Sequence, residues 1–157
     1  MIDFNLPGRE MSLKLNNLVL DLNGTLTLDG ILIAGVESKI NILKEKLQIY
    51  LLTSDTLGCG AIVAETLGIP IFKVGSEQGG KDKLNFLNTI GTEETIVIGN
   101  GYNDRLTLEY AALSIAVIGG EGCSLQALQN ADIIVNDILD GLELLINPLR
   151  IIATLRD

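Results

Sequence analysis

A single carboxylate, Asp21, ends an apolar run at 18–20 and leads into Asn23, Gly24 and Thr25. In an open α/β sheet, ligands collect at the carboxyl ends of the strands, so this carboxylate would face a site. An aspartate there can attack phosphorus and form an aspartyl-phosphate. Gly24 would free the turn, and Thr25 would offer a hydroxyl group to the anion. The alternative interpretation is a strand that is followed by an ordinary Asn-Gly turn.

A second group of polar residues follows the apolar run at 49–52. Thr53 and Ser54 bring hydroxyl groups and Asp55 brings a carboxylate. A hydroxyl group at the end of a strand could donate a hydrogen bond to a phosphoryl group, which makes all three residues candidates for substrate binding. Because Ser, Thr and Asp often cap helices, a cap of the following helix is the alternative interpretation.

Two lysines, Lys81 and Lys83, open a helix that we expect at 80–90. An ammonium group near Asp21 could neutralise the charge of that carboxylate and of the phosphoryl oxygens. Surface lysines whose charged ends lie in water are the alternative interpretation. We therefore treat both lysines as candidate substrate-binding residues.

A candidate metal site follows the apolar strand that we expect at 95–99. Asn100 comes directly after this strand, and Asp104 begins the next helix. Mg²⁺ prefers oxygen ligands, usually one or two carboxylates together with water and phosphate. Asp21, the backbone carbonyl group of Asn23, and Asp104 or Asn100 could supply such a set. Alternatively, Asp104 only complements the helix dipole.

Composition limits the chemistry and the partners. The 157 residues include 11 Lys and Arg against 20 Asp and Glu, so the net charge of −9 disfavours nucleic acid or an anionic membrane as a partner. The absence of histidine excludes Ser-His triads and His-ligated zinc. Cys59 and Cys123 are isolated, which is typical of a reducing cytosol. We expect a soluble, cytoplasmic protein that binds a small phosphorylated substrate, and association into a homo-oligomer stays open.

The hydrophobic pattern predicts one domain over 1–157, with a hairpin at 1–16 and a small β-hairpin flap at 26–33. Apolar strands then alternate with helices to the end of the chain, which indicates an α/β fold: a three-layer, doubly wound parallel sheet. Asn147-Pro148 should break the last helix. Beyond this break, an apolar stripe at 149–155 is expected to pack on the sheet, with a dimer contact as the alternative.

Three stretches, together with the lysine near the start of the helix expected at 80–90, resemble the motifs of the haloacid dehalogenase (HAD) superfamily of phosphoryl-transfer enzymes, whose fold is of this Rossmann-like type. Asp-x-x-Gly-Thr at 21–25 resembles the first motif and Leu-Thr-Ser-Asp at 52–55 the second. Gly-Asn-Gly-Tyr-Asn-Asp at 99–104 is similar to the fourth motif of P-type ATPases. The resemblance implies Asp21 as the nucleophile and Thr53 as the phosphate-binding hydroxyl group. It also implies Mg²⁺ as the cofactor, and it favours Lys83 over Lys81 as the site lysine.

Two residues depart from that pattern. Phosphatases of the superfamily usually carry a second aspartate at the position of Asn23, and an amide cannot carry its proton. Asn100 replaces an acid that is usually a magnesium ligand. Only about two dozen residues separate the first two motifs, which leaves no room for a cap domain.

We therefore predict a Mg²⁺-dependent phosphatase or ATPase-like hydrolase that acts slowly through an aspartyl-phosphate on Asp21, with Asn23, Thr53 and Lys83 as the other catalytic residues. A phosphate-binding or regulatory protein without turnover is the alternative. A dinucleotide-binding module is disfavoured, because Asp104 stands where its third glycine belongs.

Overall fold

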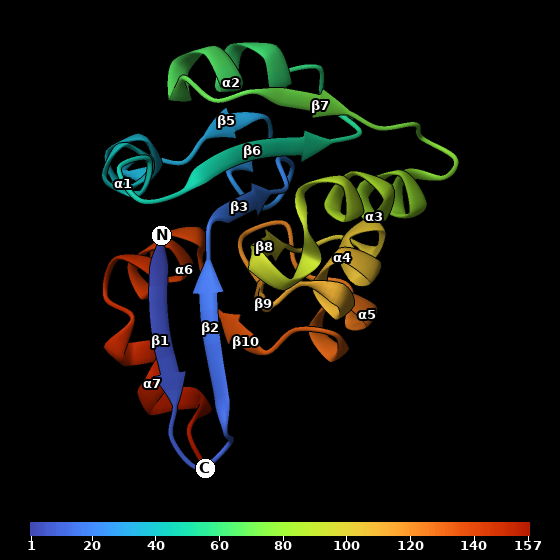
Figure 1. Cartoon of the computed structure of the whole chain (residues 1–157). Helices are drawn as coiled ribbons and strands as arrows, with labels where there is room; N and C mark the ends of the chain where they lie inside the picture. The colour runs from blue at the N-terminus through green and yellow to red at the C-terminus, as the bar shows by residue number, and fades with distance from the viewer.

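A six-stranded parallel sheet runs through the middle of the molecule, and the computed structural model describes every residue from Met1 to Asp157 (Figure 1). The order across the sheet is β10 (Ile133–Val135), β9 (Leu113–Val117), β8 (Thr95–Gly99), β3 (Asn17–Leu20), β6 (Gln48–Thr53) and β7 (Ile71–Lys73). From β3 the chain builds outward through β6 to β7, and it then crosses to β8 on the other side of β3. The strand order therefore reverses between β3 and β8, and such reversals are where doubly wound sheets bind ligands.

Helices cover both faces of this sheet, which confirms the predicted three-layer fold. The central strands β3, β8 and β9 are buried on both faces and their side chains alternate. Leu18 and Leu20 therefore join a core cluster of 29 buried residues, while Val19 joins a cluster of six on the opposite face. The helices of the larger cluster are α1 (Val36–Leu43), α2 (Gly60–Leu67) and α6 (Ile138–Ile146). Those of the smaller cluster are α3 (Gly79–Ile90), α4 (Arg105–Tyr110) and α5 (Leu125–Gln129), which lie together beside the sheet in Figure 1.

Two antiparallel hairpins lie outside the central sheet. The N-terminal hairpin pairs β1 (Ile2–Leu6) with β2 (Met11–Leu15), in the range expected for it. The flap pairs β4 (Thr27–Leu28) with β5 (Ile31–Leu32). Both residues of its turn have positive φ, 51° at Asp29 and 79° at Gly30, which is the conformation of a tight two-residue hairpin turn. The chain has no cap domain, as predicted.

The C-terminal segment differs from the prediction. Asn147 and Pro148 do separate α6 from a last helix, α7 (Leu149–Leu155). This helix packs on β1 and on α6 rather than on the central sheet, so the predicted packing is wrong. The N-terminal hairpin extends beyond the central sheet, with α7 beside it (Figure 1). Ile151 of this helix is buried, while Leu149 is 79% exposed.

The remaining element boundaries shift by a few residues. The helix that we expect to begin at Asp104 is preceded by a 3₁₀ turn, η2 (Tyr102–Asp104), and α4 follows it at Arg105. A second such turn, η1 (Thr92–Glu94), precedes β8. No helix of the chain is long and apolar enough to cross a bilayer.

Candidate active site

Two carboxylates flank the point where the strand order reverses. Asp21 directly follows β3, and Asp104 ends the η2 turn that follows β8. Because β3 and β8 are parallel neighbours, their carboxyl ends open at the same edge of the sheet. The juxtaposition that the sequence motifs predicted for these two residues is therefore present in the fold.

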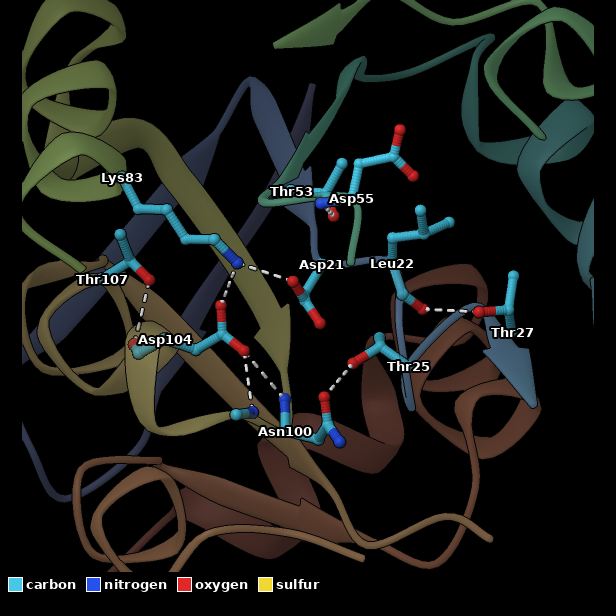
Figure 2. A network of polar contacts seen from close by, with 11 residues as sticks. Asp21, Leu22, Thr25, Thr27, Thr53, Asp55, Lys83, Asn100, Asp104 and Thr107 are labelled. Atoms are coloured by element: carbon cyan, nitrogen blue, oxygen red, sulfur yellow. Dashed lines mark hydrogen bonds and ion pairs between the residues drawn. The ribbon is translucent and has the colours of Figure 1, made fainter. Parts of the chain in front are cut away.

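Lys83 reaches between the two carboxylates from the first turns of α3. Its Nζ atom donates hydrogen bonds to Oδ1 of Asp21 at 2.6 Å and to Oδ1 of Asp104 at 2.7 Å, as Figure 2 shows. All three residues are buried, and Lys83 is only 1% exposed. A buried ammonium group held by two carboxylates is a charged cluster with a net charge of −1. We call Asp21, Lys83 and Asp104 the charged half of the site.

The pKa values of Asp21 and Lys83 in this cluster differ from the ordinary values of these groups. Burial, and next the negative charge of Asp104, raise the pKa of Asp21 to about 6, although Lys83 limits the rise. Burial opposes the charge on Lys83, but the two carboxylates outweigh it and raise the pKa of the ammonium group. At neutral pH the cluster therefore holds a nucleophilic carboxylate beside a permanent cation.

Asp104 is fixed by the backbone of its own loop. Its Oδ2 atom accepts hydrogen bonds from the N–H groups of Asn100 at 3.1 Å and Gly101 at 2.9 Å. The hydroxyl group of Thr107 donates to its backbone carbonyl group at 2.9 Å. A Cβ atom on Gly99 would come within 2.6 Å of the Asp104 carboxyl carbon, so glycine is required at the end of β8. The sequence reasoning missed the roles of Gly99 and Thr107.

The other half of the site consists of amides and a hydroxyl group, from Asn23, Thr25 and Asn100, and we call it the amide half. The Asn100 side-chain amide donates to the carbonyl oxygen of Gly122 at 3.0 Å and accepts from Thr25 at 3.1 Å. Gly24 has a φ of 79°, and a Cβ atom there would lie 2.2 Å from the amide nitrogen of Asn100. Gly24 thus lets the loop after β3 lie directly on Asn100.

The predicted contact between Thr25 and an anion is wrong. Thr25 is fully buried, and its hydroxyl group is directed at Asn100, as Figure 2 shows. The turn that the sequence identified carries this side chain inward beneath the site. Its effect is to orient the Asn100 amide.

The two ends of the second motif, Thr53 and Asp55, have different surroundings. Thr53 ends β6 and is 1% exposed, and its Oγ1 atom accepts a hydrogen bond from the N–H group of Asp55 at 2.8 Å. The Asp55 carboxylate is directed away from Asp21 in Figure 2, and it pairs with Lys73 at 2.8 Å and accepts from the N–H group of Gly60 at 2.8 Å. These partners lower the pKa of Asp55, with Lys73 as the largest cause. The predicted substrate contact of Asp55 is therefore wrong, because its carboxylate anchors the start of α2.

Lys81 and Lys83 lie in different places. Lys83 occupies the charged half, whereas Lys81 is exposed and lines a neighbouring cleft of about 380 Å³ together with Ser54. Residues two apart in a helix point in nearly opposite directions, so one α3 helix cannot direct both lysines at Asp21. Lys81 makes no contact with either carboxylate of the charged half.

The donor atoms around Asp21 suit a hard divalent cation. The predicted set contains the two carboxylates, the backbone carbonyl group of Asn23 and the amide oxygen of Asn100, and oxygen ligands of this kind are what Mg²⁺ prefers. The amide oxygen of Asn23 is buried and has no hydrogen-bond partner in the protein, so an acceptor is left for a cation or a donor. No group of three or more His, Cys, Asp or Glu side chains gathers anywhere in the chain, so any metal here would depend on amide and carbonyl oxygens.

The chain is similar in sequence to two archaeal proteins and similar in fold to a set of solved phosphatase structures. An uncharacterized protein of Methanocaldococcus jannaschii is 41% identical over 92 residues, which cover 54% of this chain and 99% of that protein. A second uncharacterized protein of the same organism is 49% identical over 39 residues, covering 25% of this chain and 89% of that protein. No family model matches the chain.

Solved structures resemble the fold closely at low sequence identity. The cobalt-bound deoxy-D-mannose-octulosonate 8-phosphate phosphatase of Haemophilus influenzae superimposes with a TM-score of 0.70 at 16% identity, over 85% of this chain and 88% of that one. The 3-deoxy-D-manno-octulosonate 8-phosphate phosphatase of Moraxella catarrhalis, solved with magnesium and phosphate, gives 0.67 at 19% identity over 90% and 94%. A phosphoserine phosphatase in its apo form gives 0.66 at 15% identity over 83% and 98%.

Proposed function

The chain belongs to the family of the two M. jannaschii proteins and is, by fold, a capless member of the HAD superfamily, and on this premise we propose that it is a Mg²⁺-dependent phosphatase-type hydrolase. The observation that carries the proposal is the bridge of Lys83 between Asp21 and Asp104 at the reversal of the strand order. This arrangement offers a carboxylate nucleophile, a cation for the phosphoryl oxygens and an anchored second carboxylate within one buried cluster.

The chain's own residues then act by positioning and charge. A carboxylate oxygen of Asp21 forms a bond to the phosphorus atom of a small phosphate monoester as the bond from phosphorus to the ester oxygen breaks. Lys83 and the Thr53 hydroxyl group stabilise the charge on the equatorial oxygens of the transferring group. Bound Mg²⁺, held by Asp21, Asp104, the backbone carbonyl group of Asn23 and the amide oxygen of Asn100, would neutralise further charge on the phosphoryl group.

Hydrolysis of the aspartyl-phosphate is the slow step in the proposed reaction. The leaving oxygen needs a proton, and the water that cleaves the aspartyl-phosphate must lose one. Asn23 occupies the position for this transfer, and an amide group has no proton to exchange at ordinary pH. We therefore expect fast phosphorylation by reactive phosphate donors and slow release of phosphate.

A phosphate-binding or regulatory role is the second candidate, and the buried amide oxygen of Asn23 favours it. An acceptor that stays without a partner is well suited to a bound cation or to the hydroxyl group of a phosphate, and binding of either needs no proton transfer. In this case the bound phosphate would contact Lys83, which Asp21 keeps in place, and Asp21 would not be phosphorylated.

Phosphorylation of Asp21 distinguishes the two candidates. The protein is incubated with acetyl phosphate and Mg²⁺, quenched in acid and analysed by mass spectrometry for a phosphoryl group on the peptide that contains Asp21. We expect modification of the wild type, loss of the modification after hydroxylamine treatment, and none in Asp21→Asn. Asp29→Asn is the matched control, since Asp29 lies in the flap turn, where asparagine also tolerates the positive φ. Wild-type protein that stays unmodified at saturating donor would contradict the enzymatic proposal.

A further inference from the structure

A hydrophilic cleft of about 380 Å³ lies beside the site at the same edge of the sheet. Its lining contains hydroxyl, amide and charged side chains and a single aromatic ring. The residues that form it are Ser54, Ser76–Lys81, Tyr102, Asn103 and Arg105. Because only one lining residue is hydrophobic, the cleft suits a polar ligand and offers little to an apolar one.

The cleft is built on the segments that hold the site residues. Ser54 follows Thr53 directly, Lys81 precedes Lys83 by two positions on α3, and Arg105 follows Asp104. A molecule whose phosphoryl group lies against Asp21 therefore has this cleft within reach of its remaining atoms.

The opposite side of the site is closed. The flap is held to the loop at 119–122, because the N–H group of Asp29 donates to Glu121 at 3.3 Å. A Cβ atom on Gly120 would lie 2.8 Å from Leu28 of the flap, and one on Gly119 would lie 3.0 Å from the carbonyl oxygen of Gly24. While that side is packed, the cleft is an open hollow on the segments that carry Thr53, Lys83 and Asp104.

Positive charge gathers in the cleft of a chain whose net charge is −9. Lys81 and Arg105 line it against a single carboxylate, Glu77, and neither cation forms a salt bridge within the protein. The guanidinium group of Arg105 stacks 4.0 Å above the ring of Tyr102, and Nη1 donates to the carbonyl oxygen of Tyr102 at 2.9 Å. These contacts fix the plane of the guanidinium group and leave its other N–H groups available to an anion.

We propose that this cleft binds the leaving part of the substrate, and that the substrate is a small, hydroxyl-rich phosphate monoester with a second anionic group, a carboxylate or a further phosphate. Arg105 and Lys81 contact the second anion, and Ser54, Ser76 and Asn103 contact its hydroxyl groups. The inference rests on the proposed function for the position of the phosphoryl group, and it adds the chemical class of the rest of the molecule.

Binding of two matched esters tests the proposal without requiring turnover. Isothermal titration of the wild-type protein in Mg²⁺ compares 3-phosphoglycerate, which carries a carboxylate, with glycerol 3-phosphate, which carries a hydroxymethyl group in its place. We expect 3-phosphoglycerate to bind about tenfold more tightly, the effect of one charge-assisted hydrogen bond. The protein's net charge favours the less charged ester, so a preference for the diacid requires a local positive site. Equal affinities, or tighter binding of glycerol 3-phosphate, would overturn the inference.

Two substitutions test whether the preference for 3-phosphoglycerate comes from the cleft. In Arg105→Gln the ratio of the two dissociation constants should fall about tenfold, towards one. Arg156→Gln removes the same charge from the far end of the chain and should leave the ratio as in the wild type. Should both variants change the ratio equally, the preference comes from overall charge and the assignment to the cleft is wrong.

The outcomes for the two proposals are separable. A preference for 3-phosphoglycerate that Arg105→Gln removes, in a protein that never modifies Asp21, supports the cleft and refutes the hydrolase. Phosphorylation of Asp21 without any preference between the two esters supports the hydrolase and refutes the cleft.

Discussion

The charged half and the amide half of the site both draw residues from the loops after β3 and β8, and they differ in how many of their polar atoms have hydrogen-bond partners. In the charged half, Lys83 is held by two carboxylates, and Asp104 is held in addition by two backbone N–H groups. In the amide half, the Asn100 side chain accepts a hydrogen bond from Thr25 and donates one to Gly122, whereas the buried amide oxygen of Asn23 has no partner. In the charged half, the ammonium group is paired with both carboxylates. In the amide half, the Asn23 oxygen is free to accept a hydrogen bond or to bind a cation from outside the chain.

This difference separates two chemical tasks that a phosphatase site combines. In the proposed function, nucleophilic attack and charge neutralisation depend on the charged half, together with the Thr53 hydroxyl group and bound Mg²⁺. Proton transfer to the leaving group and from water needs an acid at the position of Asn23, which the amide half lacks. Changes to each half should therefore affect different steps.

The largest effect is expected when the missing acid is restored. Asn23→Asp should increase the rate of phosphate release about 100- to 10,000-fold, the usual contribution of a positioned general acid and base. The measurements are the steady-state hydrolysis of an alkyl phosphate in Mg²⁺ and the lifetime of the phosphorylated Asp21.

The control for this gain is Asn88→Asp, the same replacement on an exposed position of α3. It should leave both rates as in the wild type. If Asn23→Asp leaves the lifetime of the modified protein unchanged, proton transfer is not what limits turnover.

Removing the cation of the charged half should come next in magnitude. In Lys83→Met, two buried carboxylates face each other without a counterion, so we expect the free energy of unfolding to fall by about 3–5 kcal/mol. Urea denaturation in EDTA measures this loss. Mg²⁺ should restore part of the stability, because a divalent ion supplies the missing positive charge.

Two comparisons sharpen this result. Lys81→Met changes an exposed lysine of the same helix and should alter the stability by less than about 0.5 kcal/mol. Adding Asp21→Asn to Lys83→Met removes the unpaired charge, so the double variant should be more stable than Lys83→Met alone. A double variant that is less stable would mean that the loss reflects packing and not charge.

The smallest of the three effects concerns pH. The pKa of Asp21 is raised in the folded protein from 3.8 to about 6, so folding favours its protonated form. The stability that comes from this shift is present below pH 4 and is lost as the pH rises from about 4 to 6, by on the order of 2–3 kcal/mol. Asp55 and Glu143, whose pKa values are lowered, act in the opposite direction, because the stability that they contribute is lost as the pH falls.

Asp21→Asn isolates that contribution, because asparagine resembles the protonated carboxyl group in shape and charge. In EDTA, the two proteins should be about equally stable at pH 4, and the variant should be the more stable at pH 7. The same difference in stability at both pH values would show that Asp21 titrates normally in the folded chain.

Much of the fold could be predicted because its signals are local. The apolar run before Asp21 and the run before Asn100 are strands, and Asp29-Gly30 forms a hairpin turn because this pair tolerates positive φ at both positions. Pro148 ends α6 because it lacks an N–H group and constrains the residue before it. The position of the last helix could not be predicted, since its apolar stripe fits the hairpin as well as it fits the sheet.

In the candidate site, too, some contacts could be predicted from the sequence and others could not. The sequence motifs predicted that Asp21 and Asp104 would meet, because parallel neighbouring strands end at the same edge of the sheet. They did not predict that Thr25 would be directed at Asn100, or that Asp55 would pair with Lys73. Those partners come from segments far away in the sequence, and nothing in either motif specifies them.

The sequence by itself determined the order of strands and helices and the residues at each strand end, because side-chain periodicity and turn chemistry act over a few residues. Only the tertiary structure decided which way each of those residues faces. The rotation of α3 about its own axis, fixed by the burial of Leu87 against the sheet, directs Lys83 to the carboxylates and leaves Lys81 in the cleft. That rotation depends on packing between segments far apart in the chain, which a local pattern does not contain.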